Sequence, residues 1–506
     1  MQLDPTTCYR AVQSHDTRFD GRFFVAVSST RIYCRPICSV KTPKPQNCRY
    51  FPSAAAAESL GYRPCLRCRP ELAPGNASVD ASHRLAQAAA SLIDDGALSE
   101  VGLTAMAQRL GVTDRHLRRV FQQELGVSPV VYAQTQRLLL AKRLLTDTQL
   151  SVTDVAFASG FGSLRRFNAL FSARYRLQPM QLRKTQRTGT SARAATRKNT
   201  DASAGAGLAE NAARDTQAMT FELSYRPPYD WAMLLRFLGS RCVLGVEAVA
   251  DGAYRRIVRI ERDGKQHSGW IEVTAMPRKH ALRVRLSDSL AHVTAAVLAR
   301  VKHLMDLAAH PDQIAAALGT LATNPGLRVP GAFDSFEMTV RAVLGQQITV
   351  VAARTLAGRF AAAFGTPLQT PFADLTTTFP TPQRITECTV DDIARLGIIA
   401  SRARSILALA AALASGELVL SPGVDVPSTL AKLRALPGIG EWTAQYIAMR
   451  ALAWPDAFPH SDLGVLRALG AGTTPKRALA AAESWRPWRA YAVMHLWHRE
   501  PATQKP

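Results

Sequence analysis

Four cysteines near the amino terminus have the type and spacing of a metal site. Cys34 and Cys38 form a CxxxC pair, and Cys65 and Cys68 form a CxxC pair after a longer loop. Two such pairs are typical of four thiolates that hold one zinc ion tetrahedrally. Bound zinc can stabilise a small domain, and a zinc-bound thiolate can also act as a nucleophile. The spacing alone leaves both roles open.

A second candidate site lies near the carboxyl terminus. The string "LPGIG", residues 436–440, predicts a tight turn between two helices, in which backbone N–H groups at Gly438 and Gly440 can contact a DNA phosphate. An ordinary helical hairpin turn explains these glycines equally well. Asp462 follows in an apolar, helical context, where an isolated Asp is commonly an N-cap residue.

Between these regions the sequence repeats a helix–turn–helix pattern. The first copy turns at Gly111 before a helix capped by Thr113, and the second copy has its cap at Ser163. The second helix of each copy carries exposed cations, which are Arg118 and Arg119 in the first and Arg165 and Arg166 in the second. One such pattern is common in helical bundles, but two basic copies predict a unit that reads successive major grooves.

The composition predicts several domains and a polyanionic partner. The chain has 506 residues, and its 62 Lys and Arg exceed its 39 Asp and Glu, for a formal net charge of +23. Double-stranded DNA is the expected partner of such a basic chain. We find no long apolar run and no secretory signal, so we expect a cytoplasmic, nucleoid-associated protein without a membrane partner.

The other cysteines are expected to be structural. Cys48 lies in the loop between the two pairs and is predicted to be a thiol that is not a ligand. Cys8, Cys242 and Cys388 are isolated, and a buried, unreactive thiol is the expectation for each.

Hydrophobic patterning divides the chain into five segments. We expect a small zinc α/β domain at residues 1–78, an all-α tandem helix–turn–helix domain at 80–184, a flexible linker at 185–217, an α+β domain with an antiparallel sheet at 218–308, and an all-α helix-hairpin-helix domain at 309–500. The linker assignment depends on the near absence of large apolar side chains from that segment.

The cysteine segment resembles a known family almost from end to end. "FFVAVSSTRIYCRPICSVKTPKPQNCRYFPSAAAAESLGYRPCLRCRP" is similar to the amino-terminal domain of the Ada family. The resemblance implies that Cys34, Cys38, Cys65 and Cys68 bind one zinc ion with a structural and activating role. It also implies that Cys34 accepts a methyl group from DNA methylphosphotriesters.

The same resemblance implies particular DNA contacts. Thr30, Lys41 and Arg63 occupy the places of the family's DNA-contacting residues. Ser39 stands where the family often has Arg, so one phosphate contact is expected to differ.

The helical unit in turn resembles the AraC/XylS regulators through "DVAFASGFGSLRRFNALFSARYRLQPMQLRK". This resemblance implies a transcription activator that binds promoter DNA and contacts RNA polymerase.

Residues 218–500 resemble the 3-methyladenine DNA glycosylase II family of the helix-hairpin-helix superfamily. The strings that carry the resemblance include "PGLRVPGAFDSFEMTVRAVLGQQITV", "LPGIGEWTAQYIAMR" and "WRPWRAYAVMHLW". The resemblance implies that Asp462 is the catalytic carboxylate and that Trp442, Tyr446 and Trp497 line the base pocket. Gln347 or Ile348 is the implied wedge that fills the gap left by the flipped base. Trp485 and Trp488 are expected to pack in the core.

Two departures from related families narrow the expected reaction. Bifunctional superfamily members have a Lys at the position of Trp442, so hydrolysis without strand cleavage is implied. No four-cysteine cluster follows the hairpin, so neither an iron–sulfur cluster nor an organic cofactor is expected. The resemblances together imply a methyl-sensing activator joined to a base-excision glycosylase. Two alternatives stay open: a regulator whose glycosylase half binds DNA without cleaving it, and a purely structural zinc.

Overall fold

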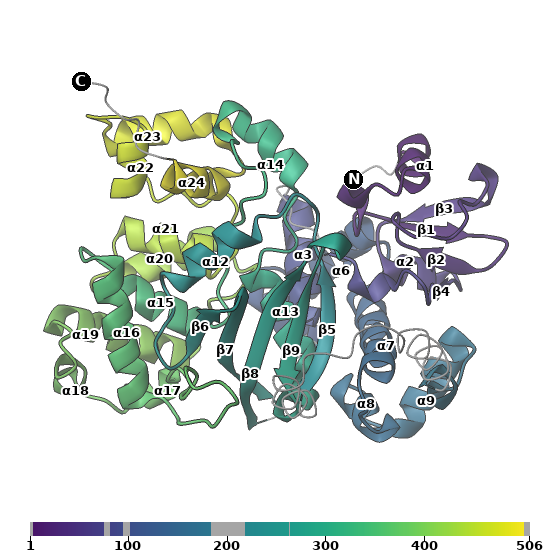
Figure 1. Cartoon of the computed structure of the whole chain (residues 1–506), viewed down its shortest axis with the longest axis horizontal. Coiled ribbons are helices and arrows are strands. Elements are labelled where there is room, and N and C mark those ends of the chain that lie inside the picture. Colours follow the sequence, from purple (N-terminus) through teal and green to yellow (C-terminus); the bar gives the residue numbers. More distant parts are fainter. Residues whose placement is uncertain (1–3, 75–80, 95–101, 184–217, 263, 500–506) are drawn as a thin grey trace, which may run out of the picture.

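The computed structural model describes residues 4–74, 81–94, 102–183, 218–262 and 264–499 (Figure 1). The predicted linker, residues 185–217, lies outside the described residues. No helix in the described ranges combines the length and apolar character needed to cross a membrane.

The amino-terminal unit is a small mixed sheet with helices packed against it. Strands β1 and β2 form an antiparallel pair, and β2 pairs with β4 in parallel, which gives the order β3-β1-β2-β4. The elements are α1 Pro5–Gln13, β1 Phe24–Val27, β2 Ile32–Cys34, β3 Cys48–Phe51, α2 Ala54–Ser59 and β4 Arg63–Pro64. The side chain of Ser53 caps α2 by accepting a hydrogen bond from the backbone N–H of Ala56.

The second unit is all-helical, as predicted. Thr113 and Ser163 cap the second helix of each helix–turn–helix copy by accepting hydrogen bonds from the backbone N–H groups of His116 and Arg166. Gly111 supplies the left-handed turn of the first copy, with a φ of 69°. The helices are α3 Ala81–Asp94, α5 Gly102–Arg109, α6 Asp114–Leu125, α7 Pro129–Asp147, α8 Val152–Ala158 and α9 Leu164–Tyr175.

The third unit is a five-stranded antiparallel sheet in the order β5-β9-β8-β7-β6. The antiparallel sheet and the helices that accompany it confirm the predicted α+β pattern. The elements are β5 Ala218–Ser224, α12 Trp231–Gly239, β6 Glu247–Ala250, β7 Ala253–Arg262, β8 Lys265–Met276, β9 Ala281–Ser287 and α13 Thr294–Leu304.

Helices build the fourth unit, which lies beyond the β6 edge of the sheet in Figure 1. The Gly turn joins α20 to α21, and Gly438 at this turn has a φ of 73° and no room for a Cβ beside Ser405. The helices are α14 Pro311–Leu318, α15 Ser335–Leu344, α16 Val350–Phe364, α17 Pro382–Thr386, α18 Val390–Ala394, α19 Ala400–Ala414, α20 Val426–Ala435, α21 Glu441–Arg450, α22 Leu463–Ala468, α23 Pro475–Ala482 and α24 Arg489–His498.

The regulator units and the sheet unit pack directly against each other. One continuous apolar core includes Phe167 and Phe171 of α9 together with Phe221 of β5. The buried Arg143 of α7 lies over the Phe221 ring, 4.8 Å from its centroid, and donates a hydrogen bond to the carbonyl of Glu222 at 2.6 Å. The two halves of the chain therefore meet through a buried interface, which the sequence did not reveal.

Candidate functional sites

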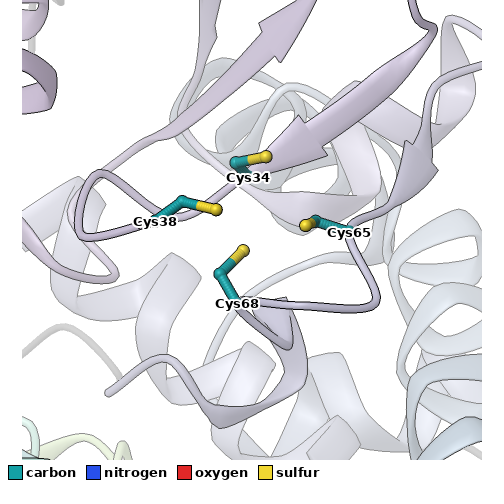
Figure 2. A group of neighbouring side chains, drawn as sticks. All are labelled: Cys34, Cys38, Cys65 and Cys68. Carbon is teal, nitrogen blue, oxygen red and sulfur yellow. The ribbon is translucent and has the colours of Figure 1, made fainter. Parts of the chain in front are cut away.

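The four predicted ligands converge at one end of the amino-terminal sheet. Cys34 ends β2, Cys65 follows β4, and Cys38 and Cys68 lie on the loops beside them, with all four sulfurs pointing toward a common centre (Figure 2). The four Sγ atoms lie within 4.8 Å of one another. This donor set fits a tetrahedral zinc site.

The thiols at this site cannot all be ionised without a cation. Hydrogen bonds with Cys38 and Cys65 raise the pKa of Cys34, whereas a hydrogen bond from Cys34 lowers the pKa of Cys65. A divalent cation at the centre removes this competition because it stabilises all four thiolates. Cys34, Cys38 and Cys65 are buried and Cys68 is half-buried, so exposure does not distinguish Cys34 from the other three.

A buried arginine that the sequence analysis missed supports the cysteine cluster. The backbone N–H of Arg35 donates to Cys68 Sγ at 3.4 Å, and its guanidinium donates to the carbonyl of Cys68 at 3.2 Å. The same guanidinium pairs with the buried Asp20, with Nε 2.8 Å from Oδ1, and donates to Ser224 Oγ of β5 at 3.0 Å. "YCRP" contains this residue, but its contacts with Asp20 and Ser224 are not visible in the sequence.

The predicted DNA-contacting residues of the zinc unit are at least partly accessible to solvent. Thr30, Ser39 and Lys41 are exposed and Arg63 is half-buried. Arg67, between the two cysteines of the CxxC pair, is also exposed and was not singled out from the sequence. Its position beside two ligands is the signal that could have identified it.

The remaining cysteines are not part of the four-sulfur group, although Cys8 and Cys48 pack in the same apolar cluster. Cys48 is half-buried, and its thiol donates to the carbonyl of Lys44 at 3.4 Å. Cys8 and Cys242 are buried as expected, and burial raises the pKa of the Cys8 thiol to about 11. Cys388 differs from the expectation because it is half-buried: its place after the short helix α17 leaves one side of the thiol open.

The cations of both recognition helices are exposed. Arg118 pairs with Asp114 one turn earlier, with Nε 2.6 Å from Oδ1, and Arg119 contacts the His116 ring at 3.1 Å. Arg165 and Arg166 are exposed on α9. Pairs of this kind on a helix surface are weak, so Arg118 can exchange Asp114 for a DNA phosphate at little cost.

The candidate carboxylate of the fourth unit is held by two tryptophans. Trp442 Nε1 donates to Asp462 Oδ2 at 3.0 Å, and Trp497 Nε1 donates to Asp462 Oδ1 at 2.8 Å. Asp462 is also the N-cap of α22, accepting from the backbone N–H of Val465 at 3.0 Å. The interpretation of Asp462 as an N-cap residue is therefore confirmed. The cap is compatible with a catalytic role because it fixes the carboxylate at the pocket.

The predicted pocket aromatics form a connected group. Trp442 and Tyr446 stack with their centroids 5.4 Å apart, and Trp497 lies 6.3 Å from Tyr446 and 6.2 Å from Phe237. Trp442, Tyr446 and Trp497 line a cavity of about 590 Å³ that is also lined by Asp462. Trp488 is buried and Trp485 packs against the core, as expected for both.

Two arginines near this cavity were missed by the sequence analysis. Arg450 donates to the Tyr446 hydroxyl oxygen at 2.8 Å, and Arg241 lies over the Phe237 ring. Burial alone would raise the pKa of Tyr446, but Arg450, Arg241 and Arg341 together hold this pKa below its ordinary value. Arg450 follows Tyr446 by four residues, so helical spacing could have placed both on one face.

The predicted wedge residues follow Gly345, which lines the cavity. Gln347 is exposed and has a left-handed backbone, with a φ of 55°, whereas Ile348 lines the cavity. The preceding Gln346 is anchored, since its side chain donates to the carbonyl of Gly438 at 2.8 Å and to Thr443 Oγ1 at 2.9 Å. The loop of residues 345–349, the wedge loop, is thus hydrogen-bonded to the Gly turn and to the start of α21.

Four family models match consecutive parts of the chain. They are the metal binding domain of Ada at residues 7–71, a helix-turn-helix domain at 106–185, the AlkA N-terminal domain at 220–334 and the HhH-GPD superfamily of base excision DNA repair proteins at 340–489. Their order agrees with the order of units expected from the sequence.

A Mycobacterium tuberculosis protein named "Probable bifunctional transcriptional activator/DNA repair enzyme AlkA" matches nearly the whole chain. It is 40% identical over 507 residues, which cover 98% of this chain and 97% of that protein. This chain belongs to that family. The family thus combines, in one chain, the zinc, helix-turn-helix and HhH-GPD units described above.

Two Escherichia coli proteins each match one half of the chain. DNA-3-methyladenine glycosylase 2 is 38% identical over 283 residues, which cover 55% of this chain and 97% of that protein. The bifunctional transcriptional activator/DNA repair enzyme Ada is 31% identical over 153 residues, which cover 30% of this chain and 42% of that protein. The two resemblances noted in the sequence are confirmed, and each is confined to its own half.

Proposed function

We propose that the chain repairs and reports DNA methylation with its amino-terminal half and excises alkylated bases with its carboxy-terminal half. The observation that carries the proposal is the presence in one chain of a four-sulfur cluster and a carboxylate held by two indoles. The first arrangement suits methyl transfer to sulfur, and the second suits hydrolysis of an N-glycosidic bond.

Cys34 is the proposed methyl acceptor. Its Sγ attacks the methyl carbon of a DNA methylphosphotriester, an S–C bond forms, and the C–O bond breaks with its electron pair left on the phosphate oxygen. One zinc ion, when bound, keeps the four thiols deprotonated at neutral pH. We expect Thr30, Lys41 and Arg67, which are exposed, and Arg63, which is half-buried, to hold the phosphate backbone during this transfer.

Methylation also supplies a physical switch for transcription. Zn²⁺ with four thiolates totals −2, and a neutral thioether at Cys34 changes the total to −1. Less negative charge near the phosphates strengthens DNA binding. The helix–turn–helix cations, Arg118, Arg119, Arg165 and Arg166, then read the promoter, and the bound activator recruits RNA polymerase in the cytoplasm.

Asp462 is the proposed glycosylase carboxylate. The flipped base stacks among Trp442, Tyr446 and Trp497, and Gln347 fills its place in the duplex because it stands at the exposed tip of the wedge loop. An alkylated purine carries a positive charge and leaves readily, so Asp462 needs only to stabilise the developing sugar cation and orient water. With Trp442 in place of a lysine, the proposed reaction is monofunctional.

Two measurements test the two activities. Peptide mass spectrometry after incubation with methylphosphotriester DNA should locate one methyl group on Cys34, and methyl on another cysteine would contradict the assignment.

Base release from methylated DNA should fall by about a thousandfold in Asp462→Asn, with unchanged DNA binding. Equal release by wild type and this variant would refute the carboxylate's role.

A further inference from the structure

Arg354 is one of five arginines that line the glycosylase cavity, and neither the sequence nor the proposed mechanism assigns it a role. Arg354 lies on α16 and lines the cavity with Val350, Ala353 and Ala357, which share its helix face. It also borders a second hollow beside Cys242 and Thr376. Arg354 therefore stands in the wall of the base pocket.

The other partly buried arginines of the cavity are already engaged. Arg341 donates to Glu247 at 2.9 Å and to Glu337 at 3.0 Å. Arg241 donates to the carbonyl of Phe237 at 3.3 Å and to Ser240 Oγ at 2.9 Å. Both guanidinium groups are held by the protein itself.

Arg354 differs because its buried Nε has no hydrogen-bond partner among the described residues. A buried donor without an acceptor is unfavourable, and the neighbouring wall residues Val350, Ala353 and Ala357 are apolar. The indole N–H groups of Trp442 and Trp497 are both bound to Asp462. Arg354 is thus a cation in the pocket wall whose buried Nε lacks an acceptor in the described part of the chain, so its guanidinium group is free of the protein contacts that hold Arg341 and Arg241.

We propose that Arg354 hydrogen-bonds to a ring carbonyl oxygen of the flipped base and so favours 6-oxopurines over 6-aminopurines. The inference rests on the proposed glycosylase function and adds the class of base to it. A methylated guanine presents its O6 acceptor to the guanidinium group; in 7-methylguanine this is the one that remains of the two acceptors, O6 and N7, that arginine contacts in DNA recognition. A methylated adenine carries an amino group, which is a hydrogen-bond donor, at the position of O6. It therefore offers Arg354 no acceptor that could offset the unfavourable approach of two positive charges.

DNA treated with dimethyl sulfate tests this within one reaction, because it contains both 7-methylguanine and 3-methyladenine. The released bases are separated and counted, and the ratio of their initial release rates is compared between wild type and Arg354→Ala. We expect the 7-methylguanine to 3-methyladenine ratio to fall about tenfold or more, as for loss of a charge-assisted hydrogen bond. Arg354→Lys, which keeps the charge but loses the fork, should fall between the two.

Arg359→Ala is the matched control. Arg359 is on the same helix and exposed, does not line the cavity, and donates to the carbonyl of Leu396 at 3.2 Å. Its substitution should leave the ratio within about twofold of wild type.

An unchanged ratio in Arg354→Ala overturns the proposal. If the release rates of both bases fall equally, Arg354 contacts the DNA backbone and not the base. If neither rate falls, Arg354 has no part in recognition. If Arg354→Ala does not fold, the same ratio of release rates, measured for Arg354→Lys, tests the proposal. Release of neither base by wild type would instead refute the glycosylase function itself, so the two failures are distinct.

Discussion

The cysteine cluster and the glycosylase cavity treat the same kind of damage with opposite architectures. The four sulfurs come from 35 consecutive residues, Cys34 to Cys68, and leave one small centre for a metal ion. The cavity is assembled from α15, α16, α21, α22 and α24, together with Arg241 after α12, and has a volume of about 590 Å³. A thiol that keeps the methyl group needs no room for a leaving base, whereas a catalyst must admit and release one at each turnover.

The comparison predicts that metal binding matters for only one of the two sites. Cys68→Ala should abolish stoichiometric zinc binding and unfold the amino-terminal unit, since structural zinc contributes about 10 kcal/mol or more to such a domain. Base release should remain within about twofold of wild type, because every cavity residue lies after position 230. Metal analysis and a base-release assay measure the two effects.

Cys48→Ala is the control for this change. Cys48 lies outside the four-sulfur cluster, and its variant should keep one zinc ion per chain. Full zinc content in Cys68→Ala, or its loss in Cys48→Ala, would contradict the ligand assignment.

A pH dependence distinguishes the amino-terminal half further. Glu58 is fully buried between the zinc unit and α7, where it accepts from Tyr33 Oη at 2.9 Å, and burial raises its pKa to about 7 from an ordinary 4.5. The folded state therefore prefers protonated Glu58, and this contribution to stability is present below about pH 4.5 and lost as the pH rises through 7.

Glu58→Gln should remove that loss. Relative to wild type, the variant should gain up to about 3 kcal/mol in the free energy of unfolding between about pH 5 and pH 8. Thermal midpoints of both proteins at the two pH values measure it. A difference that is the same at both pH values would show that Glu58 does not titrate in this range.

The smallest predicted effect concerns the cavity. Trp497→Phe keeps an aromatic ring but removes the 2.8 Å hydrogen bond to Asp462, so base release should slow about tenfold. Trp485 makes no such bond and packs against the core, so Trp485→Phe should stay within about twofold. The same slowing in both variants would show that Trp497 acts through general packing and not through the carboxylate.

The same contrast explains how much could be predicted from the sequence. The zinc ligands, the caps Thr113 and Ser163 and the Gly turn are local, so spacing reveals them. Strand β5 was missed because its seven residues follow a segment without apolar pattern, and its pairing with β9 depends on residues about sixty positions away. Arg35, Arg354 and Arg450 were missed for the same reason: their roles come from contacts with distant elements.

Asp462 shows how one residue can carry two interpretations, of which the N-cap is confirmed and the catalytic role stays a prediction. An Asp before an apolar run indicates an N-cap, and the structure confirms the cap. The two indoles that bind it come from positions 442 and 497. Only the fold brings them to the cap, so the sequence could place the carboxylate but not the groups that orient it.

The central claim is that one chain contains a reagent consumed once and a catalyst that turns over. Wild-type protein of known concentration is incubated with excess DNA that carries both methylphosphotriesters and methylated purines, and methyl on Cys34 and free base are counted in the same samples. We predict that methylation stops at one group per chain while base release continues far beyond one per chain. Unmethylated Cys34, or base release that stops at one equivalent, would contradict it.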